Sequence, residues 1–261
     1  MSLNNTIIIR LLVLLFFMAY INRSYGQQET YFYKIQDVIA KERSDTAFSI
    51  KLDSLKKTRR PNDSYIRVLF NRDVDFGYKH KKIQVEFNTT CNYQINMLTK
   101  NDTICFSSVT FNNIFGEPNA YEISFNKKHS IPKMDTIKTL TYLKSRNLFY
   151  HSSKTLNDLK NELDSNQWYE LSSGDQDVDS REKKHIDTLV KRKDFKELEI
   201  MLKSINCETQ TYAVRGFDLL KKKKVPIPVK DKIIIDHIKR RNSDLESTAG
   251  DVGPIIWKAF K

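Results

Sequence analysis

The chain contains little glycine and proline, with 7 Gly and 6 Pro in 261 residues. Collagen-like and low-complexity chains need far more of both, so this composition excludes those classes. Hydrophobic residues make up 39% of the chain and charged residues 29%, as in folded globular proteins. The length is sufficient for one large domain or two small ones.

The short motifs of well-known catalytic and nucleotide-binding sites are also missing. There is no G-x-S-x-G, H-E-x-x-H, G-x-x-x-x-G-K-[ST], G-x-G-x-x-G or C-x-x-C pattern. We therefore predict no catalytic residue and no cofactor, although a site assembled from distant residues would not be detected in this way. No two histidines share a metal-ligand spacing on one helix, and we interpret all of them as surface or half-buried residues: His80, His129, His151, His185 and His237.

One acidic segment resembles the opening of a calcium-binding loop, with Asp175, Asp177 and Asp179 at alternate positions. Such a loop requires Gly at its sixth place and Glu at its twelfth. Ser180 and Ile186 occupy those places. We therefore predict no metal site here.

An apolar run stands near the start of the chain. Arg10 precedes Leu11–Tyr20, and Ser24-Tyr25-Gly26 then supplies small residues. This order is typical of a secretory signal peptide, and the run is shorter than the roughly 20 residues of a membrane span. We predict a signal peptide at 1–26, no transmembrane span after its removal, and an exported, periplasmic or extracellular protein. Retention of the segment as an uncleaved anchor is the alternative.

Positive charge is in excess after that segment. Removing 1–26 leaves 42 basic and 32 acidic residues, a net charge of +10, and 27–153 holds 20 basic against 13 acidic residues. A basic exported protein can meet anionic lipid, polysaccharide or nucleic acid, but lysine also simply keeps proteins soluble. No specific nucleic-acid motif accompanies the charge.

The N-terminal half passes from short helices to strands. Apolar positions at helical spacing predict helices at Tyr31–Lys41 and Ala47–Lys57, followed by a turn at Arg59–Asp63. From Tyr65 the apolar positions alternate, which predicts half-buried strands in an antiparallel sheet or sandwich. The expected strands centre on Ile66–Phe70, Ile83–Phe87, Tyr93–Met97, Ile104–Phe111, Tyr121–Phe125 and Ile137–Leu143.

The three cysteines, Cys91, Cys105 and Cys207, cannot all pair within one chain. A hairpin with its tip at Lys100–Asp102 places Cys91 on the order of 17 Å from Cys105, because a strand rises about 3.3 Å per residue. A disulfide needs Cα atoms within about 7 Å. The hairpin and a disulfide between these two cysteines therefore exclude each other, and we favour the hairpin.

Helical spacing returns in the C-terminal half, so we predict an α+β protein with an N-terminal antiparallel β-rich domain at 27–150 and a small all-α domain at 180–245. A short helix marked by Leu156, Leu159 and Leu163, expected to end around Ser165, and a linker separate them at 151–179, and 246–261 forms a C-terminal tail. We expect Asp179, Asp194 and Asn206 to cap helices. Pro226 and Pro228 end one helix, and Val229–Arg241 forms another.

The segment Asp194–Leu220 predicts two short helices packed as a hairpin. Gly216 lowers helix stability by roughly 1 kcal/mol relative to Ala, so close packing of the neighbouring helix is the expected reason for it. Leu198 and Leu202 on the first helix, and Ala213-Val214 with Arg215 on the second, resemble a HEAT-type helical repeat over 180–241. The residue order around Arg215 departs from that pattern, and arrays usually need at least three units. The resemblance implies protein binding; an ordinary helical bundle is the alternative.

A basic aromatic segment, Tyr78–Lys82, is expected in a loop before a strand. Together with Arg72, its lysines Lys79, Lys81 and Lys82 are candidates for contacting phosphate or sulfate groups, and a solvated loop is the alternative. Our leading hypothesis is an exported, non-catalytic protein-interaction module that binds another envelope protein or an anionic polymer. The alternatives are an exported hydrolase with a site between the two domains, and binding to an anionic surface through the basic N-terminal half.

Overall fold

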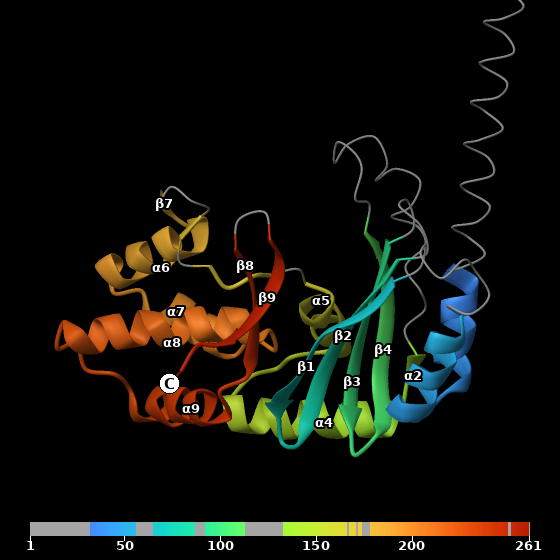
Figure 1. Ribbon diagram of the computed structural model, residues 1–261. Helices are drawn as coiled ribbons and strands as arrows, with labels where there is room; N and C mark the ends of the chain where they lie inside the picture. Colours follow the sequence, from blue (N-terminus) through green and yellow to red (C-terminus); the bar gives the residue numbers. More distant parts are fainter. Residues whose placement is uncertain are drawn as a thin grey trace, which may run out of the picture. The chain divides into compact units, whose positions relative to one another are not determined.

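The computed structural model describes residues 32–55, 65–86, 92–112, 133–165, 167–170, 172–173, 178–249 and 252–260 (Figure 1). Several predictions lie outside these ranges and remain predictions: the signal peptide at 1–26, the turn at Arg59–Asp63, the strand at Tyr121–Phe125, His129 and the first two aspartates of the calcium-like segment. Within the described residues, no helix combines the length and apolar character needed to cross a membrane.

The α+β prediction is confirmed. An antiparallel five-stranded sheet with strand order β1-β2-β3-β4-β5 occupies the N-terminal half, and helices follow it. In chain order the elements are residues 32–41 (helical), α2 (Asp45–Ser54), β1 (Tyr65–Asp75), β2 (Tyr78–Glu86), β3 (Asn92–Lys100), β4 (Thr103–Asn112), β5 (Lys133–Met134), α4 (Thr136–Tyr150), α5 (Leu156–Leu163), β6 (Ser172–Ser173), β7 (Val178–Asp179), α6 (Arg181–Arg192), α7 (Phe195–Leu202), α8 (Cys207–Lys222), α9 (Val229–Arg241), β8 (Asp244–Ala249) and β9 (Val252–Lys258).

The chain forms two compact units that do not follow its order. The first comprises 1–66, 84–94 and 109–130, and the second comprises 67–83, 95–108 and 131–261. The boundary between strands and helices was predicted near His151, a position that lies inside the second unit. The helices that follow the sheet begin earlier, at Thr136, where α4 starts.

Residues 32–41 and α2 supply the core of the first unit. Their buried side chains recur at helical spacing: Phe32, Ile35, Ile39, Phe48 and Leu52. The ring of Phe32 lies 6.3 Å from that of Tyr93 on β3. The N-cap of α2 is Ser44, whose side chain accepts a hydrogen bond from the Ala47 amide.

Two tight turns order the strands of the sheet. Phe76 and Gly77 join β1 to β2 with φ of 54° and 76°, and Asn101 and Asp102 join β3 to β4 with φ of 47° and 63°. Positive φ at both central residues matches the right-handed twist of paired strands. The hairpin expected at Lys100–Asp102 is confirmed. Cys105, on β4, has a free and buried thiol, as the hairpin requires.

One strand prediction and one loop prediction were wrong. Ile137–Leu143 is not a strand but part of α4, whose N-cap Asp135 accepts a hydrogen bond from the Lys138 amide. Its buried residues follow the helical period, and the β-branched residues at its start gave a false signal of alternation. Tyr78–Lys82 is not a loop but the first half of β2.

Two further corrections concern the C-terminal half. The segment 246–261 does not form a tail: β8 and β9 pair as an antiparallel hairpin, with Asp244 opposite Lys258 and Leu245 opposite Trp257. The cap of α6 is Ser180 and not Asp179, because the Ser180 side chain accepts from the Lys183 amide while Asp179 forms an ion pair with Lys183.

Helices α7 and α8 pack as the predicted hairpin in the second unit. Asp194 and Asn206 cap them as expected, accepting from the amides of Glu197 and Thr209. Gly216 on α8 packs directly against α7: a Cβ atom there would lie 2.6 Å from Cδ2 of Leu198. The absence of a side chain therefore sets how close the two helices come.

Replacing Gly216 with Leu should destabilise the second unit by about 3 kcal/mol, because overpacking a filled core typically costs 1–3 kcal/mol and Leu198 leaves no room even for a Cβ. Thermal unfolding followed by circular dichroism measures the effect. Leu198→Ala, which removes the clashing atoms, should recover part of the loss in the double variant. An unchanged melting temperature for Gly216→Leu would mean that the helices do not meet at this point.

Candidate functional site

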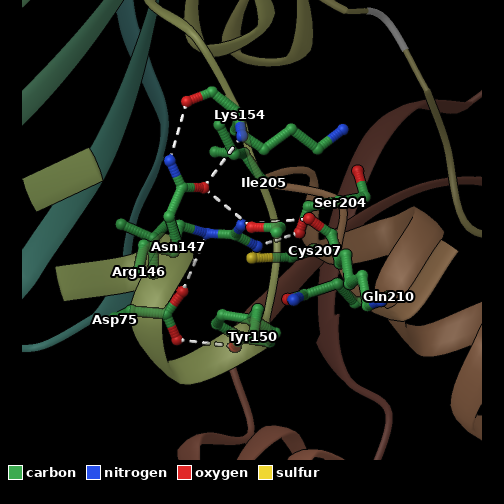
Figure 2. A network of polar contacts seen from close by, with 12 residues as sticks. Asp75, Arg146, Asn147, Tyr150, Lys154, Ser204, Ile205, Cys207 and Gln210 are labelled. Atoms are coloured by element: carbon green, nitrogen blue, oxygen red, sulfur yellow. Dashed lines mark hydrogen bonds and ion pairs between the residues drawn. The ribbon is translucent and has the colours of Figure 1, made fainter. Parts of the chain in front are cut away.

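A buried carboxylate, Asp75, contacts four side chains of the second unit, two of which, Arg146 and Tyr150, are labelled in Figure 2. It is 3% exposed and lies at the end of β1. Its oxygens lie 2.7 Å from Nη1 of Arg241, 2.9 Å from Nε2 of His237, 2.9 Å from the Tyr150 hydroxyl and 3.3 Å from Nε of Arg146. These donors come from α4 and α9, so one carboxylate connects a strand to two helices.

The surrounding donors keep Asp75 ionised. Burial by itself would raise the pKa of Asp75, but the charge of Arg241, the His237 hydrogen bond and the charge of Arg146 outweigh burial and lower that pKa. Burial raises the pKa of the partner hydroxyl, Tyr150, so the phenol stays protonated and donates. Asp75 is therefore a carboxylate, and Tyr150 a phenol, at neutral pH.

Arg146 extends this cluster to the connection between α7 and α8. Its guanidinium is fully buried, donates to the carbonyl of Lys203 at 2.9 Å and to that of Ser204, and stacks 4.2 Å from the Tyr150 ring. The last carbonyls of a helix have no partners within the helix and carry negative potential, which a cation stabilises. Arg146 thus neutralises Asp75 and caps α7 at the same time.

Glu162 of α5 holds the same connection. Its carboxylate accepts from the Ser204 hydroxyl and the Ile205 amide, and it pairs with Lys154. Asn147 accepts from the Lys154 amide at 2.9 Å and donates to the Lys154 carbonyl at 2.8 Å (Figure 2). The α7–α8 connection is therefore fixed by side chains from both α4 and α5.

A second buried ion cluster ties β1 and β2 to α8 and β8. Arg72 forms a bidentate ion pair with Glu208. The Glu208 carboxylate also accepts a hydrogen bond from the Glu246 amide at 2.9 Å. Lys82 donates to Glu246 at 2.6 Å. Burial would lower the pKa of Arg72, and the Glu208 carboxylate and the nearby Cys207 raise it instead, so Arg72 stays charged.

The four predicted anion-contacting residues do not form a surface patch. Arg72 and Lys82 are 3% exposed and are neutralised by Glu208 and Glu246. Lys81 is buried at 8% exposure, whereas Lys79 is exposed. Because strand residues alternate between faces, Lys79 points away from the buried neighbours of Lys82. The structure therefore leaves only one of these four cations facing solvent.

Aromatic rings cover the Asp75 cluster. The His237 ring lies 4.6 Å from that of Phe149 and 6.1 Å from that of Phe76, with which it stacks. Phe76 has a φ of 54°, a left-handed conformation that bulky residues rarely adopt. This turn places the Phe76 ring against the His237 ring at the edge of the ion cluster.

The geometry includes an Asp–His pair of the kind that general bases use. Asp75, however, already accepts hydrogen bonds from Arg241 and Tyr150 and forms an ion pair with Arg146. Cys207, on α8, lies 3.6 Å from Nη2 of Arg241 and takes part in the same cluster. No sequence motif marks these residues. Among the residues that the structure describes, no three metal-ligating side chains converge.

His80 is buried, which contradicts our interpretation of it as a surface or half-buried residue. Its Nε2 lies 3.1 Å from Oδ1 of Asn96, and it is 4% exposed. Burial, together with the charges of Arg72 and Lys82, lowers the pKa of His80 well below its ordinary value. A neutral imidazole fits this position because the neighbouring cations oppose a further positive charge.

Asp231, in the first turn of α9, is the clearest unsatisfied group. It is 1% exposed, and neither of its carboxyl oxygens receives a hydrogen bond in the described part of the chain. Burial first, and then the negative charge of Glu199 on α7, raise its pKa. The ionised form of Asp231 is therefore disfavoured where α9 begins.

Comparisons with known proteins give no relative for this arrangement: no family model, curated protein or solved structure matches the chain.

Replacing Asp75 with Asn should lower the free energy of unfolding by about 3–5 kcal/mol at pH 7, because removal of one partner leaves buried charge uncompensated. Asp73→Asn, on the same strand but exposed, should change it by less than about 0.5 kcal/mol. The folded pKa of Asp75 is lowered, so its contribution is present above the unfolded pKa near 3.9 and is lost as pH falls through the folded pKa. Urea unfolding at several pH values should show the deficit of Asp75→Asn shrinking in acid; a pH-independent deficit would contradict this.

Replacing Asp231 with Asn should instead raise the free energy of unfolding, by about 1 kcal/mol at pH 7, because a buried ionised group without donors is removed. The folded pKa of Asp231 is raised, so the stability linked to its protonated form is present below the unfolded pKa and is lost as pH rises through the folded pKa. The advantage of the variant should vanish in mild acid. Asp236→Asn, exposed on the same helix, is the matched control for these urea titrations. A loss of stability in Asp231→Asn at pH 7 would count against this account.

Proposed function

We propose that this chain is an exported, non-catalytic module that binds another protein. One observation carries the proposal: α4 exposes large apolar side chains, with Ile137 79% and Leu148 78% exposed. Single exposed apolar residues are common on protein surfaces, but several on one helix are typical of a surface that a partner covers. Export rests on the predicted signal peptide at 1–26.

The arrangement of the ionisable groups supports the same proposal. Asp75, Glu208 and Glu246 each have a basic partner in the chain itself, and their elements meet through these pairs. Groups used in this way stabilise a rigid scaffold, and a rigid scaffold presents a binding surface with little loss of conformational entropy.

The test uses the full chain as bait in an envelope extract of the producing cell, with cross-linking and quantitative mass spectrometry. We expect one protein to be retained saturably and to be displaced by untagged chain. The hydrolase alternative is tested in parallel with fluorogenic ester, phosphate and glycoside substrates. Turnover by the wild type that His237→Gln abolishes, without any saturable protein partner, would overturn the proposal.

A further inference from the structure

Helix α4 carries apolar residues on two faces. One face is buried in the second unit and includes Thr139, Tyr142, Leu143, Arg146 and Tyr150. The other face includes Ile137, Leu140, Lys144 and Leu148, all exposed. Since these positions follow at intervals of three, four and four residues, they lie on one side of the helix.

A groove runs beside this second face. It lies between α4 and the start of α5, has a volume of 760 Å³, and is lined by Leu140, Leu143, Lys144, Asn147, Lys154, Thr155, Leu156 and Asn157. The groove is largely open to solvent, so a partner could lie along it. The exposed stripe from Ile137 to Leu148 extends along about three helical turns, roughly 16 Å. Three of its lining residues are leucines, Leu140, Leu143 and Leu156, and the other five are polar or charged.

The charges at the groove have one sign. Lys144 and Lys154 are its charged lining residues, and no Asp or Glu lines it in the described part of the chain. Lys154 pairs with Glu162, which also binds the α7–α8 connection. Lys144 is exposed and has no ion-pair partner among the described residues. A partner with acidic side chains would supply the missing countercharge.

From this arrangement we infer that the α4–α5 groove binds an amphipathic helix of a partner protein. That helix has large aliphatic residues such as leucine on one face and acidic residues beside them. Grooves between helices accept such helices through anchors at i, i+3, i+4 and i+7. The inference rests on the proposed interaction function and specifies its surface and the chemistry of its partner.

A second copy of this chain fits the groove less well. In a two-fold symmetric dimer the same patch meets itself, so Lys144 of each copy would face basic groups of the other. The formal net charge of +12 adds to this repulsion. Charge complementarity therefore favours an acidic partner.

Fluorescence anisotropy with the full chain at physiological salt tests the inference. The probe is a labelled synthetic 18-residue helical peptide with leucines at i, i+3, i+4 and i+7 flanked by glutamates. A second peptide has lysines in place of the glutamates, and a third has the same composition in scrambled order. We expect the acidic amphipathic peptide to bind at least about tenfold more tightly than either of the others, a difference of about 1.4 kcal/mol.

Surface variants locate the binding. Leu140→Glu and Leu148→Glu should each weaken binding of the acidic peptide at least about tenfold, and Lys144→Glu should shift preference toward the basic peptide. Ile233→Glu, a 54% exposed position on α9, is the matched control and should bind like the wild type. Because Leu148 and Lys144 are exposed, the melting temperature of their variants should stay unchanged, which separates lost binding from lost folding.

Three outcomes would overturn the inference. Equal affinity for acidic and basic peptides would remove the charge argument. Acidic-peptide binding that all the α4 variants retain would place binding elsewhere, while leaving the proposed interaction function intact. Concentration-dependent dimerisation that Leu148→Glu abolishes, without peptide binding, would identify a second copy as the occupant. Saturable capture of a partner in the envelope-extract experiment decides the interaction function separately.

Discussion

The carboxylate of Asp75 is the constraint on which the second unit depends. Arg241, His237, Tyr150 and Arg146 converge on it from α4 and α9. Arg146 also donates hydrogen bonds to the carbonyls of Lys203 and Ser204, and so it links Asp75 to the connection between α7 and α8. Strand, helices and connection are therefore positioned relative to one buried charge.

Such clusters fix a packing arrangement more than they add net stability. Removing charges from water is costly, and the attraction between them offsets the cost only when every partner is in place. The two clusters hold four cations, Arg72, Lys82, Arg146 and Arg241, against the three carboxylates of Asp75, Glu208 and Glu246. The carbonyl groups at the end of α7 face the guanidinium of Arg146 and supply part of the missing negative potential. An alternative packing would leave at least one of these charges buried and unpaired.

Local sequence signals predicted local structure well. Alternation gave the positions of β1 to β3, and a less clean alternation gave that of β4, but β3 is buried on both faces and not half-buried as predicted. The caps Asp194 and Asn206 gave the starts of α7 and α8, and Gly216 pointed to a close helix contact. Period assignment failed at α4, where Ile and Thr at the start of a helix imitated a strand. These are errors of short windows, in which strand and helix patterns overlap.

The ion clusters were not predictable from the sequence, for a physical reason. Arg241 lies 166 residues from Asp75 and Glu208 lies 136 from Arg72, so no spacing rule connects them. Arg72 and Lys82 resembled surface anion contacts because a basic side chain in a strand shows nothing of its burial. The exposed apolar stripe of α4 could not be predicted either, because the sequence does not show which face of that helix packs against the core.

A double-mutant cycle between Asp75 and Arg146 tests the central claim most directly. Asp75→Asn, Arg146→Met and the double variant are compared with the wild type by urea unfolding at pH 7. If the buried cluster positions α4 and the α7–α8 connection, the two single losses in the free energy of unfolding should not add. The loss in the double variant should be smaller than the sum of the two single losses by at least about 1.5 kcal/mol. Additivity within about 0.5 kcal/mol would show that the two residues act independently and would contradict the account.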